Sequence, residues 1–309
     1  MKKIVMATLL AAVSLAASAQ VAVTGKASMW VDNTKVGGAS ATSQVVEPTS
    51  NIAFSVTEKL GNGVVARGVI ETSLAGNTIG GTGTQLGDRQ STVGLASSFG
   101  SVDFGRNVHS QFLAVTNNDA FGTLYGSVAG DVHNLRGLRY SQGTFVTLTP
   151  VKNLAVSYDR STTGLGNEIQ SYSLVANIAG LTWTAAEFKQ GAEKSTVFGA
   201  SAKLGAAQLF YTHSDDESLQ NSRGNLVGVR YALAPNLTGK ASYGRQSKTA
   251  LFVIGPSAYG PRETTTAYAL GLDYAMSKRT EIGVAYRNVD APAGYVDTKQ
   301  VGVGITHRF

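Results

Sequence analysis

The chain has 309 residues, a formal net charge of +6 and charged residues at 15%, below the roughly 25% usual for soluble domains. Cysteine is absent, which excludes disulfides and thiolate metal sites. The apolar residues, 43% of the chain, are dispersed, and beyond the N-terminus no run approaches the roughly 18 residues of a membrane-spanning helix. The 36 glycines and only 6 prolines, with frequent Val, Thr and Tyr, favour strands and turns over helices.

The N-terminus has the pattern of an export signal. Two lysines precede an apolar run over residues 4–17, and Ala17, Ser18 and Ala19 form a small-x-small cleavage pattern. The sequence therefore predicts a signal peptide over residues 1–19. Removing the two lysines lowers the net charge from +6 to +6 − 2 = +4.

Alternating segments then follow one another to the C-terminus, and no linker or change in composition interrupts them, which predicts one domain over residues 20–309. Period-2 patterns indicate sixteen strands. These lie near residues 21–32, 50–60, 64–72, 88–96, 101–106, 136–148, 154–160, 170–178, 181–189, 195–204, 206–213, 225–233, 237–246, 264–276, 280–288 and 298–309.

The last segment, residues 297–309, shows two different faces. Val301, Val303 and Ile305 share one face with His307 and Phe309, whereas glycine, threonine and arginine occupy the other. One face suits lipid and the other suits water. A sheet in a bilayer must close on itself, so this last strand is expected to pair with the first.

The connections decide between a membrane barrel and a soluble β-sandwich, because both alternate in the same way. Short links near residues 61–63, 97–100, 150–153, 179–180, 205, 234–236 and 277–279 alternate with longer ones near 33–49, 73–87, 107–135, 161–169, 190–194, 214–224, 247–263 and 289–297. Tight turns at one end and long loops at the other are typical of bacterial outer-membrane barrels, and sixteen strands leave a water-filled bore.

Several stretches resemble the general porins of β-proteobacteria, in the Gram-negative porin family. They are Ser50 to Phe54, Thr57 to Gly63, Arg89 to Leu95, Phe99 to Arg106, Leu138 to Tyr140, Met276 to Glu281 and Thr306 to Phe309. The resemblance implies a homotrimer of all-β, 16-stranded antiparallel transmembrane β-barrels, each with an inward-folded third external loop. It implies a cell outer membrane location among lipid and lipopolysaccharide. It also implies passage of small hydrophilic solutes and ions without a cofactor, and a terminal Phe309 that the outer-membrane assembly machinery recognises.

The longest connection, residues 107–135, lies where the pore loop of that family would lie. It carries its own apolar side chains, among them Phe112, Phe121 and Leu124, which must be buried somewhere. The bore is the nearest place where these side chains could be buried, and an ordinary surface loop is the alternative.

A pore selects by its width and by the charges at its narrowest section. Arg67 is in phase with Glu71, and Arg139 lies between Leu138 and Tyr140, so both arginines are predicted to face the lumen. The resemblance implies a basic ladder of Arg67, Arg89 and Arg139 that faces acidic groups on the loop, for which Asp119 and Asp131 are the candidates.

Two arginines leave a conflict open. Arg89 shares its parity with Val93 and Leu95, which would turn it toward lipid unless a bulge intervenes, whereas the resemblance puts it in the pore. Arg106 has the same difficulty. Further charges with lumen parity are Lys26, Lys203, Arg230, Lys240, Arg287 and Arg308 against Asp103, Asp159, Asp273 and Glu281. The balance is positive and predicts a preference for anions.

Other functions fit the sequence less well. The four histidines belong to no catalytic motif, which argues against an enzyme, and His109 and His133 are too far apart in one loop to indicate a metal site. Basic residues are scattered singly, which argues against nucleic acid binding. The main alternative is a barrel that serves as an adhesin or structural anchor with little conductance.

Overall fold

The computed structural model describes residues 19–46, 49–74, 85–133, 135, 138–162, 168–217, 222–247, 264–291 and 296–309. The signal peptide predicted over residues 1–19 lies, apart from Ala19, outside the described residues, and its removal stays a prediction.

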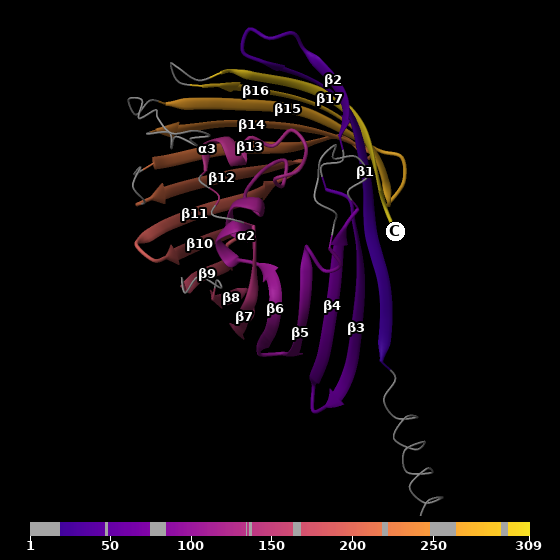
Figure 1. Cartoon of the computed structure of the whole chain (residues 1–309), viewed down its shortest axis with the longest axis vertical. Coiled ribbons are helices and arrows are strands. Elements are labelled where there is room, and N and C mark those ends of the chain that lie inside the picture. Colours follow the sequence, from indigo (N-terminus) through magenta and orange to yellow (C-terminus); the bar gives the residue numbers. More distant parts are fainter. Residues whose placement is uncertain are drawn as a thin grey trace, which may run out of the picture.

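The described residues form one antiparallel sheet that closes into a barrel (Figure 1). Its strands are β1 (Gln20–Val36), β2 (Thr42–Val46), β3 (Asn51–Gly61), β4 (Val64–Ser73), β5 (Gln90–Ser97), β6 (Gly100–Val108), β7 (Arg139–Val151), β8 (Leu154–Thr162), β9 (Glu168–Ile178), β10 (Leu181–Gln190), β11 (Glu193–Leu204), β12 (Ala207–Asp216), β13 (Ser222–Ala234), β14 (Leu237–Ser247), β15 (Thr265–Ala275), β16 (Thr280–Asp290) and β17 (Thr298–Arg308).

The closure depends on β1, which pairs with β17 on one side and with both β2 and β3 on the other. Residues 30–34 of β1 pair with β2, and residues 20–26 pair with β3, so β2 and β3 together occupy one strand position beside β1. The seventeen segments therefore make sixteen positions around the wall. The predicted 16-stranded antiparallel barrel is confirmed.

Short turns connect the strands at one end of the barrel. The link between β3 and β4 is Asn62 and Gly63, with φ angles of 49° and 76°. Two successive positive φ angles are those of a type I′ turn, whose twist matches that of the adjoining strands and for which Asn-Gly is preferred. The local sequence at this link therefore determines a tight hairpin.

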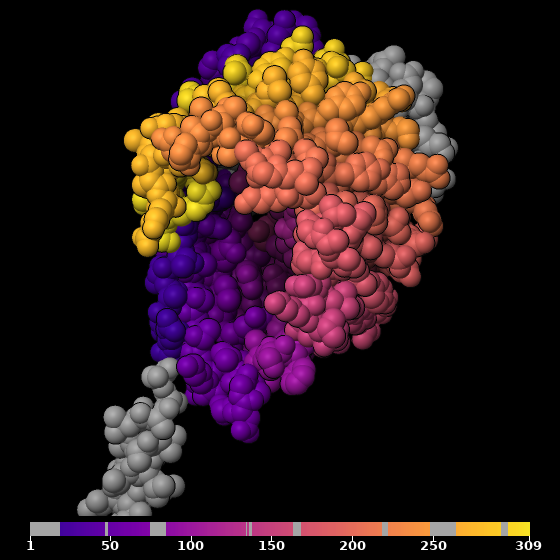
Figure 2. All heavy atoms as spheres, turned by 180° about the vertical axis from the view of Figure 1, so that it is seen from behind, coloured from indigo at the N-terminus to yellow at the C-terminus, as the bar shows by residue number. Residues whose placement is uncertain are grey.

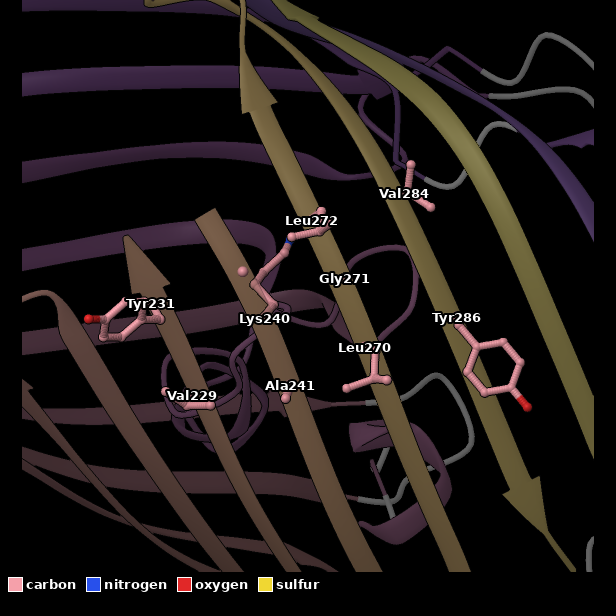
Figure 3. A pocket seen from close by; sticks show the side chains of 10 residues that line it. Val229, Tyr231, Lys240, Ala241, Leu270, Gly271, Leu272, Val284 and Tyr286 are labelled. Atoms are coloured by element: carbon pink, nitrogen blue, oxygen red, sulfur yellow. The ribbon is translucent and has the colours of Figure 1, made fainter. Parts of the chain in front are cut away.

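The outer face of the wall is apolar. Val301, Val303 and Ile305 of β17 are 45%, 49% and 47% exposed, although such side chains are usually buried in a protein surrounded by water. Figure 3 shows the same outer face over β13 to β16, where Val229, Tyr231 and Leu270 border a shallow apolar hollow of about 460 Å³. This face is suited to contact with lipid chains. In the described part of the chain, no helix is long and apolar enough to cross a membrane.

The hydrophobic core lies inside the barrel, against the connection between β6 and β7. Residues 109–133 of this connection, the inner loop, include the short helices α2 (Ser110–Thr116) and α3 (Ala129–Val132). Figure 1 shows both helices within the curve of the sheet. Val115, Phe121 and Val132 of the inner loop are fully buried and form one cluster with wall residues such as Leu226. Apolar burial therefore attaches the inner loop to the wall.

We predict that deleting Phe309 reduces the fraction of chains that assemble into folded barrels several-fold. Phe309 extends the closing pair, because its N–H donates to the Gly25 carbonyl at 3.1 Å and its carbonyl accepts from the Gly25 N–H at 3.0 Å. The measurement is the folded fraction in outer-membrane preparations, read from the heat-dependent shift in electrophoretic mobility. Phe99→Ala is the matched control, since Phe99 lies in a short turn and is 76% exposed. Normal assembly of the shortened chain would contradict the prediction.

Candidate functional site

The inner loop lies so close to the wall that glycine is required beneath it. A methyl group at Gly224 of β13 would overlap the Val132 carbonyl oxygen, and one at Gly271 of β15 would lie 2.9 Å from the Phe121 ring. Real side chains do not approach so closely, so these two positions accept the inner loop only because they lack a Cβ atom.

Hydrogen bonds fix the first half of the inner loop to β8 through β12. Ser110 donates from both its backbone N–H and its hydroxyl to the Asp159 carboxylate. Gln111 Nε2 donates to Ser195 Oγ at 2.9 Å. Farther along, Thr212 Oγ1 donates to the carbonyl of Asn118 at 2.9 Å. The pairs are buried, where an unpaired polar group would be costly, so α2 has one well-defined position.

Two basic residues of the wall hold the turn after α2. Arg230 Nε donates to the Ala120 carbonyl at 2.5 Å, and its Nη2 donates to the Asp119 carbonyl at 3.3 Å. Lys240 forms an ion pair with Asp273 at 2.5 Å, and its ammonium lies 5.0 Å from the centre of the Phe121 ring. These charges, predicted to line the pore, are covered by the inner loop.

The inner loop reaches across to the first strand. Tyr125 stacks on Trp30 of β1 with ring centres 4.1 Å apart, and it also lies against Gly302 of β17. The contacts of the inner loop thus extend from β7, through His109 and Tyr140, to β17 and β1. The inner faces of β3 to β6 are left largely uncovered, and beside α2 they border a remaining space. Figure 2 shows the hollow that remains between the early strands, in indigo and purple, and the later strands, in pink and orange.

Neither predicted loop acid meets the arginines of that uncovered wall. Asp119 is 1% exposed and accepts hydrogen bonds from Phe121 N at 3.1 Å, Thr123 N at 2.7 Å and Ser127 Oγ at 2.7 Å. Its carboxylate therefore shapes the inner loop from within. Asp131 forms an ion pair with Arg287 of β16, on the covered side.

Arg67 and Asp103 form an ion pair on the uncovered wall. The Arg67 guanidinium donates through both Nε, at 2.8 Å, and Nη2 to the Asp103 carboxylate. Asp103 is two strands away on β6, and both residues lie opposite Gly94 of β5. Gly94 has no side chain between them, so the inward-facing Arg67 and Asp103 side chains can contact each other across β5.

Arg89 turns toward Glu71. It precedes the first residue of β5, so the alternation of that strand does not orient it, and its Nε lies 2.5 Å from Glu71 Oε1. Asn51 Nδ2 donates to the same oxygen at 2.5 Å. The geometry resolves the sequence conflict at Arg89, because Glu71 shares the inward parity of Arg67 on β4.

Arg106, Arg139 and Lys26 complete the basic group. Arg106 lies where the register between β6 and β7 shifts, and it donates to the Asp88 carbonyl at 2.6 Å and to Ser141 Oγ at 2.9 Å. Arg139 is within electrostatic reach of Arg89 and Arg106, and Lys26 is within reach of Arg89. Neither Arg139 nor Lys26 forms an ion pair with any described residue.

The remaining predicted charges lie on β11, β16 and β17, and Arg308 and Glu281 are within electrostatic reach of Lys26. Glu281 pairs with Arg308 at 2.8 Å, and Lys203 is exposed beside the turn between β11 and β12. Within the described residues no cluster of three or more His, Cys, Asp and Glu could hold a metal ion.

The two histidines of the inner loop are buried. His109 lies 5.3 Å from the ring centres of both Tyr140 and Phe188. The Nδ1 atom of His133 is 2.7 Å from Ser214 Oγ. Burial, aided by the charge of His213, lowers the pKa of His133 to about 3.

Sequence reasoning missed a cavity of about 240 Å³ between α2 and the wall. Its lining includes Arg67, Leu113 and Asn117, together with Phe145 and Asp159. The parity of the wall residues was readable in the sequence, but the approach of α2 to them was not. Charged and hydroxyl side chains of the wall thus line the same cavity as one face of α2.

Comparisons with known proteins agree on one family. A family model described as Gram-negative porin matches residues 7–308. The major outer membrane protein P.IB of Neisseria lactamica is 26% identical over 353 aligned residues, which cover 100% of both chains.

Solved structures show the same fold. An anion-selective porin from Comamonas acidovorans has a TM-score of 0.76 at 19% identity, covering 94% of this chain and 100% of that one. OmpT of Vibrio cholerae, in a trimer form, has a TM-score of 0.69 at 12% identity, covering 94% and 99%. OmpF of Salmonella typhi in complex with daunomycin has a TM-score of 0.69 at 17% identity, covering 94% and 97%. At these low sequence identities, the structural similarity supports the fold alone.

We predict that Gly224→Val loosens the inner loop. The new side chain overlaps the Val132 carbonyl and so forces α3 from the wall, at a cost of about 1–3 kcal/mol for overpacking. Amide hydrogen exchange over residues 109–133 should then speed up roughly tenfold. Gly38→Val is the control, because a Cβ atom at Gly38 meets nothing within 4 Å. Unchanged exchange in Gly224→Val would show that the inner loop is not held there.

We also predict that acid loosens the inner loop through His133. Its pKa of about 3 lies below the ordinary 6.5, so above pH 6.5 both docked and undocked forms are neutral. Between pH 6.5 and 3 the undocked histidine binds a proton that the docked one does not, and docking therefore weakens as the pH falls. Hydrogen exchange of the inner loop at pH 7 and pH 4 measures this. His133→Asn should weaken that dependence, and an equal acid response in both proteins would refute the assignment.

Proposed function

This chain belongs to the Gram-negative porin family, and from that premise we propose that it prefers anions among the small solutes it passes. As a porin it is a channel of the outer membrane and not an enzyme. Its barrel provides the aqueous path through the lipid. Which ions the channel prefers depends on the charged residues of this particular chain.

The observation that carries the proposal is the charge of the wall opposite the inner loop. Five basic side chains, Lys26, Arg67, Arg89, Arg106 and Arg139, belong to this side against three acidic ones, Glu71, Asp88 and Asp103. The excess is positive among the described residues. An anion that enters a narrow passage loses part of its hydration and is stabilised by nearby fixed positive charge.

These basic side chains contribute unequally to the proposed selectivity. Arg67 and Arg89 are each opposed by a carboxylate at hydrogen-bond distance, which offsets much of their field. Arg139 and Lys26 have no ion pair with a described residue. We therefore assign the largest share to Arg139 and Lys26, with Arg67 and Arg89 shaping the wall at the constriction.

The acidic residues of the inner loop have a different part in this proposal. Asp119 and Asp131 hold the inner loop in place, the first through hydrogen bonds within it and the second through Arg287. Their charges are engaged away from the permeating ion. Neither carboxylate of the inner loop is therefore free to attract cations.

We also propose that three barrels assemble into a homotrimer surrounded by lipid and lipopolysaccharide, after insertion by the outer-membrane assembly machinery. The apolar outer face supports burial against lipid or another barrel. A solved relative, OmpT of Vibrio cholerae, is described in a trimer form.

We predict that Arg139→Ala lowers the chloride-to-potassium permeability ratio about fivefold, because one unit charge about 8 Å away in a water-like medium stabilises chloride and destabilises potassium by about 0.5 kcal/mol each. Arg89→Ala should have a smaller effect, since Glu71 opposes its charge. Reversal potentials in a potassium chloride gradient across a planar bilayer provide the measurement.

The control for both variants is Arg279→Ala, in an exposed turn between β15 and β16. It removes the same charge at the short-turn end of the barrel, opposite to the end that carries Arg89 and Arg139, and should leave the ratio unchanged. A wild-type channel that prefers potassium would overturn the proposed anion preference.

A further inference from the structure

The inner loop presents apolar side chains to the aqueous lumen. Leu113 in α2 and Leu124 beyond it are 44% and 41% exposed. The inner loop lies inside the barrel, so the parts of its side chains that are not buried against the wall face the bore. Asn117, the residue after α2, is the polar neighbour of Leu113 in the lining of the cavity beside α2. Apolar groups that face water gain free energy when an apolar solute covers them.

Leu113 faces a wall arginine. It lines the cavity of about 240 Å³ together with Arg67, Val108 and Phe145. The two carboxylates of this cavity are already engaged, Asp103 by Arg67 and Asp159 by Ser110. The Arg67 side chain keeps 35% of its surface exposed. One side of this space is therefore apolar and the other presents a guanidinium edge.

A similar combination occurs at the start of α2. Val108, two residues before α2, is the register partner of Arg139. The next residue along β7, Tyr140, stacks with Phe188 at 5.9 Å between ring centres. Arg139 thus lies beside apolar Val108 at the end of β6, and its guanidinium forms no ion pair with a described residue. A guanidinium is well suited to planar and tetrahedral oxyanions.

We propose that the channel favours small organic anions that carry an apolar group beside the charged one, because basic and apolar surfaces line opposite sides of its passage. The inference rests on the proposed anion preference and adds the solute class. The oxyanion contacts Arg139 or Arg67 while the apolar group contacts Leu113 and Leu124. An inorganic anion of the same charge makes only the first contact.

Benzenesulfonate and methanesulfonate test this proposal, because both stay ionised and do not leak across lipid as neutral acids. Their permeabilities relative to chloride follow from bi-ionic reversal potentials across a bilayer that contains the purified channel. Benzenesulfonate is larger and diffuses more slowly in water, yet it should be more permeant than methanesulfonate. The double variant Leu113→Ser with Leu124→Ser should lower the benzenesulfonate ratio roughly three- to fivefold, as expected for loss of a small apolar contact.

Leu86→Ser is the matched control, since Leu86 is 75% exposed and lies outside the inner loop. Leu113→Met with Leu124→Met keeps both surfaces apolar and should retain the wild-type order. Normal chloride conductance and heat-dependent mobility establish that each variant folds.

A wild-type channel that passes methanesulfonate better than benzenesulfonate would overturn the inference. An order that survives the double serine variant would overturn it as well. Either result combined with a preference for chloride over potassium leaves the proposed anion preference intact. A preference for potassium would refute the anion preference itself.

Discussion

The structure depends on the need to pair every backbone N–H and C=O group inside a lipid bilayer. An open sheet edge would leave such groups without partners, at several kcal/mol each. The pairing of β1 with β17, from Lys26 with Arg308 to Val36 with Thr298, removes the edge. Once the wall is closed, its two faces meet different surroundings, and the strict alternation of side chains follows. The bore then becomes a second, internal surface on which the inner loop can settle.

The inner loop turns a symmetric tube into an asymmetric passage. It occupies the side from β8 to β17, where the inward wall residues are small, such as Ala267, Ala269 and Gly271. It leaves β3 to β6 largely uncovered, and these strands, with the ends of β5 and β7, carry Arg67, Arg89 and Arg139. The apolar core of the protein therefore lies inside the barrel. The same burial that holds the inner loop decides which charges stay available to solutes.

The charges divide accordingly into two groups. Arg230, Lys240 and Arg287 act on the inner loop, through a carbonyl, an aromatic ring and a carboxylate. Arg139 and Lys26 form no ion pair with a described residue, and in the proposed function their charges act on the passage. Because Asp119 and Asp131 are engaged by the inner loop and by Arg287, no acidic partner on the inner loop offsets those charges. The side of the passage opposite the arginines is lined by leucine instead, which makes it amphipathic.

The sequence by itself determined the barrel, the approximate positions of its sixteen predicted strands and the inward parity of Arg67 with Glu71, because alternation and turn preference are local properties with a period of two residues. It also located the inner loop by its length. It missed β2, which lies inside the connection predicted over residues 33–49. Only the tertiary structure decided which charges meet. Arg67 pairs with Asp103 at a separation of 36 residues and Arg287 with Asp131 at 156. Such pairs depend on the stagger of the strands and on the path of the inner loop across the bore, and neither leaves a local pattern. For the same reason the burial of Asp119 and the turn of Arg89 toward Glu71 became visible only in the folded wall.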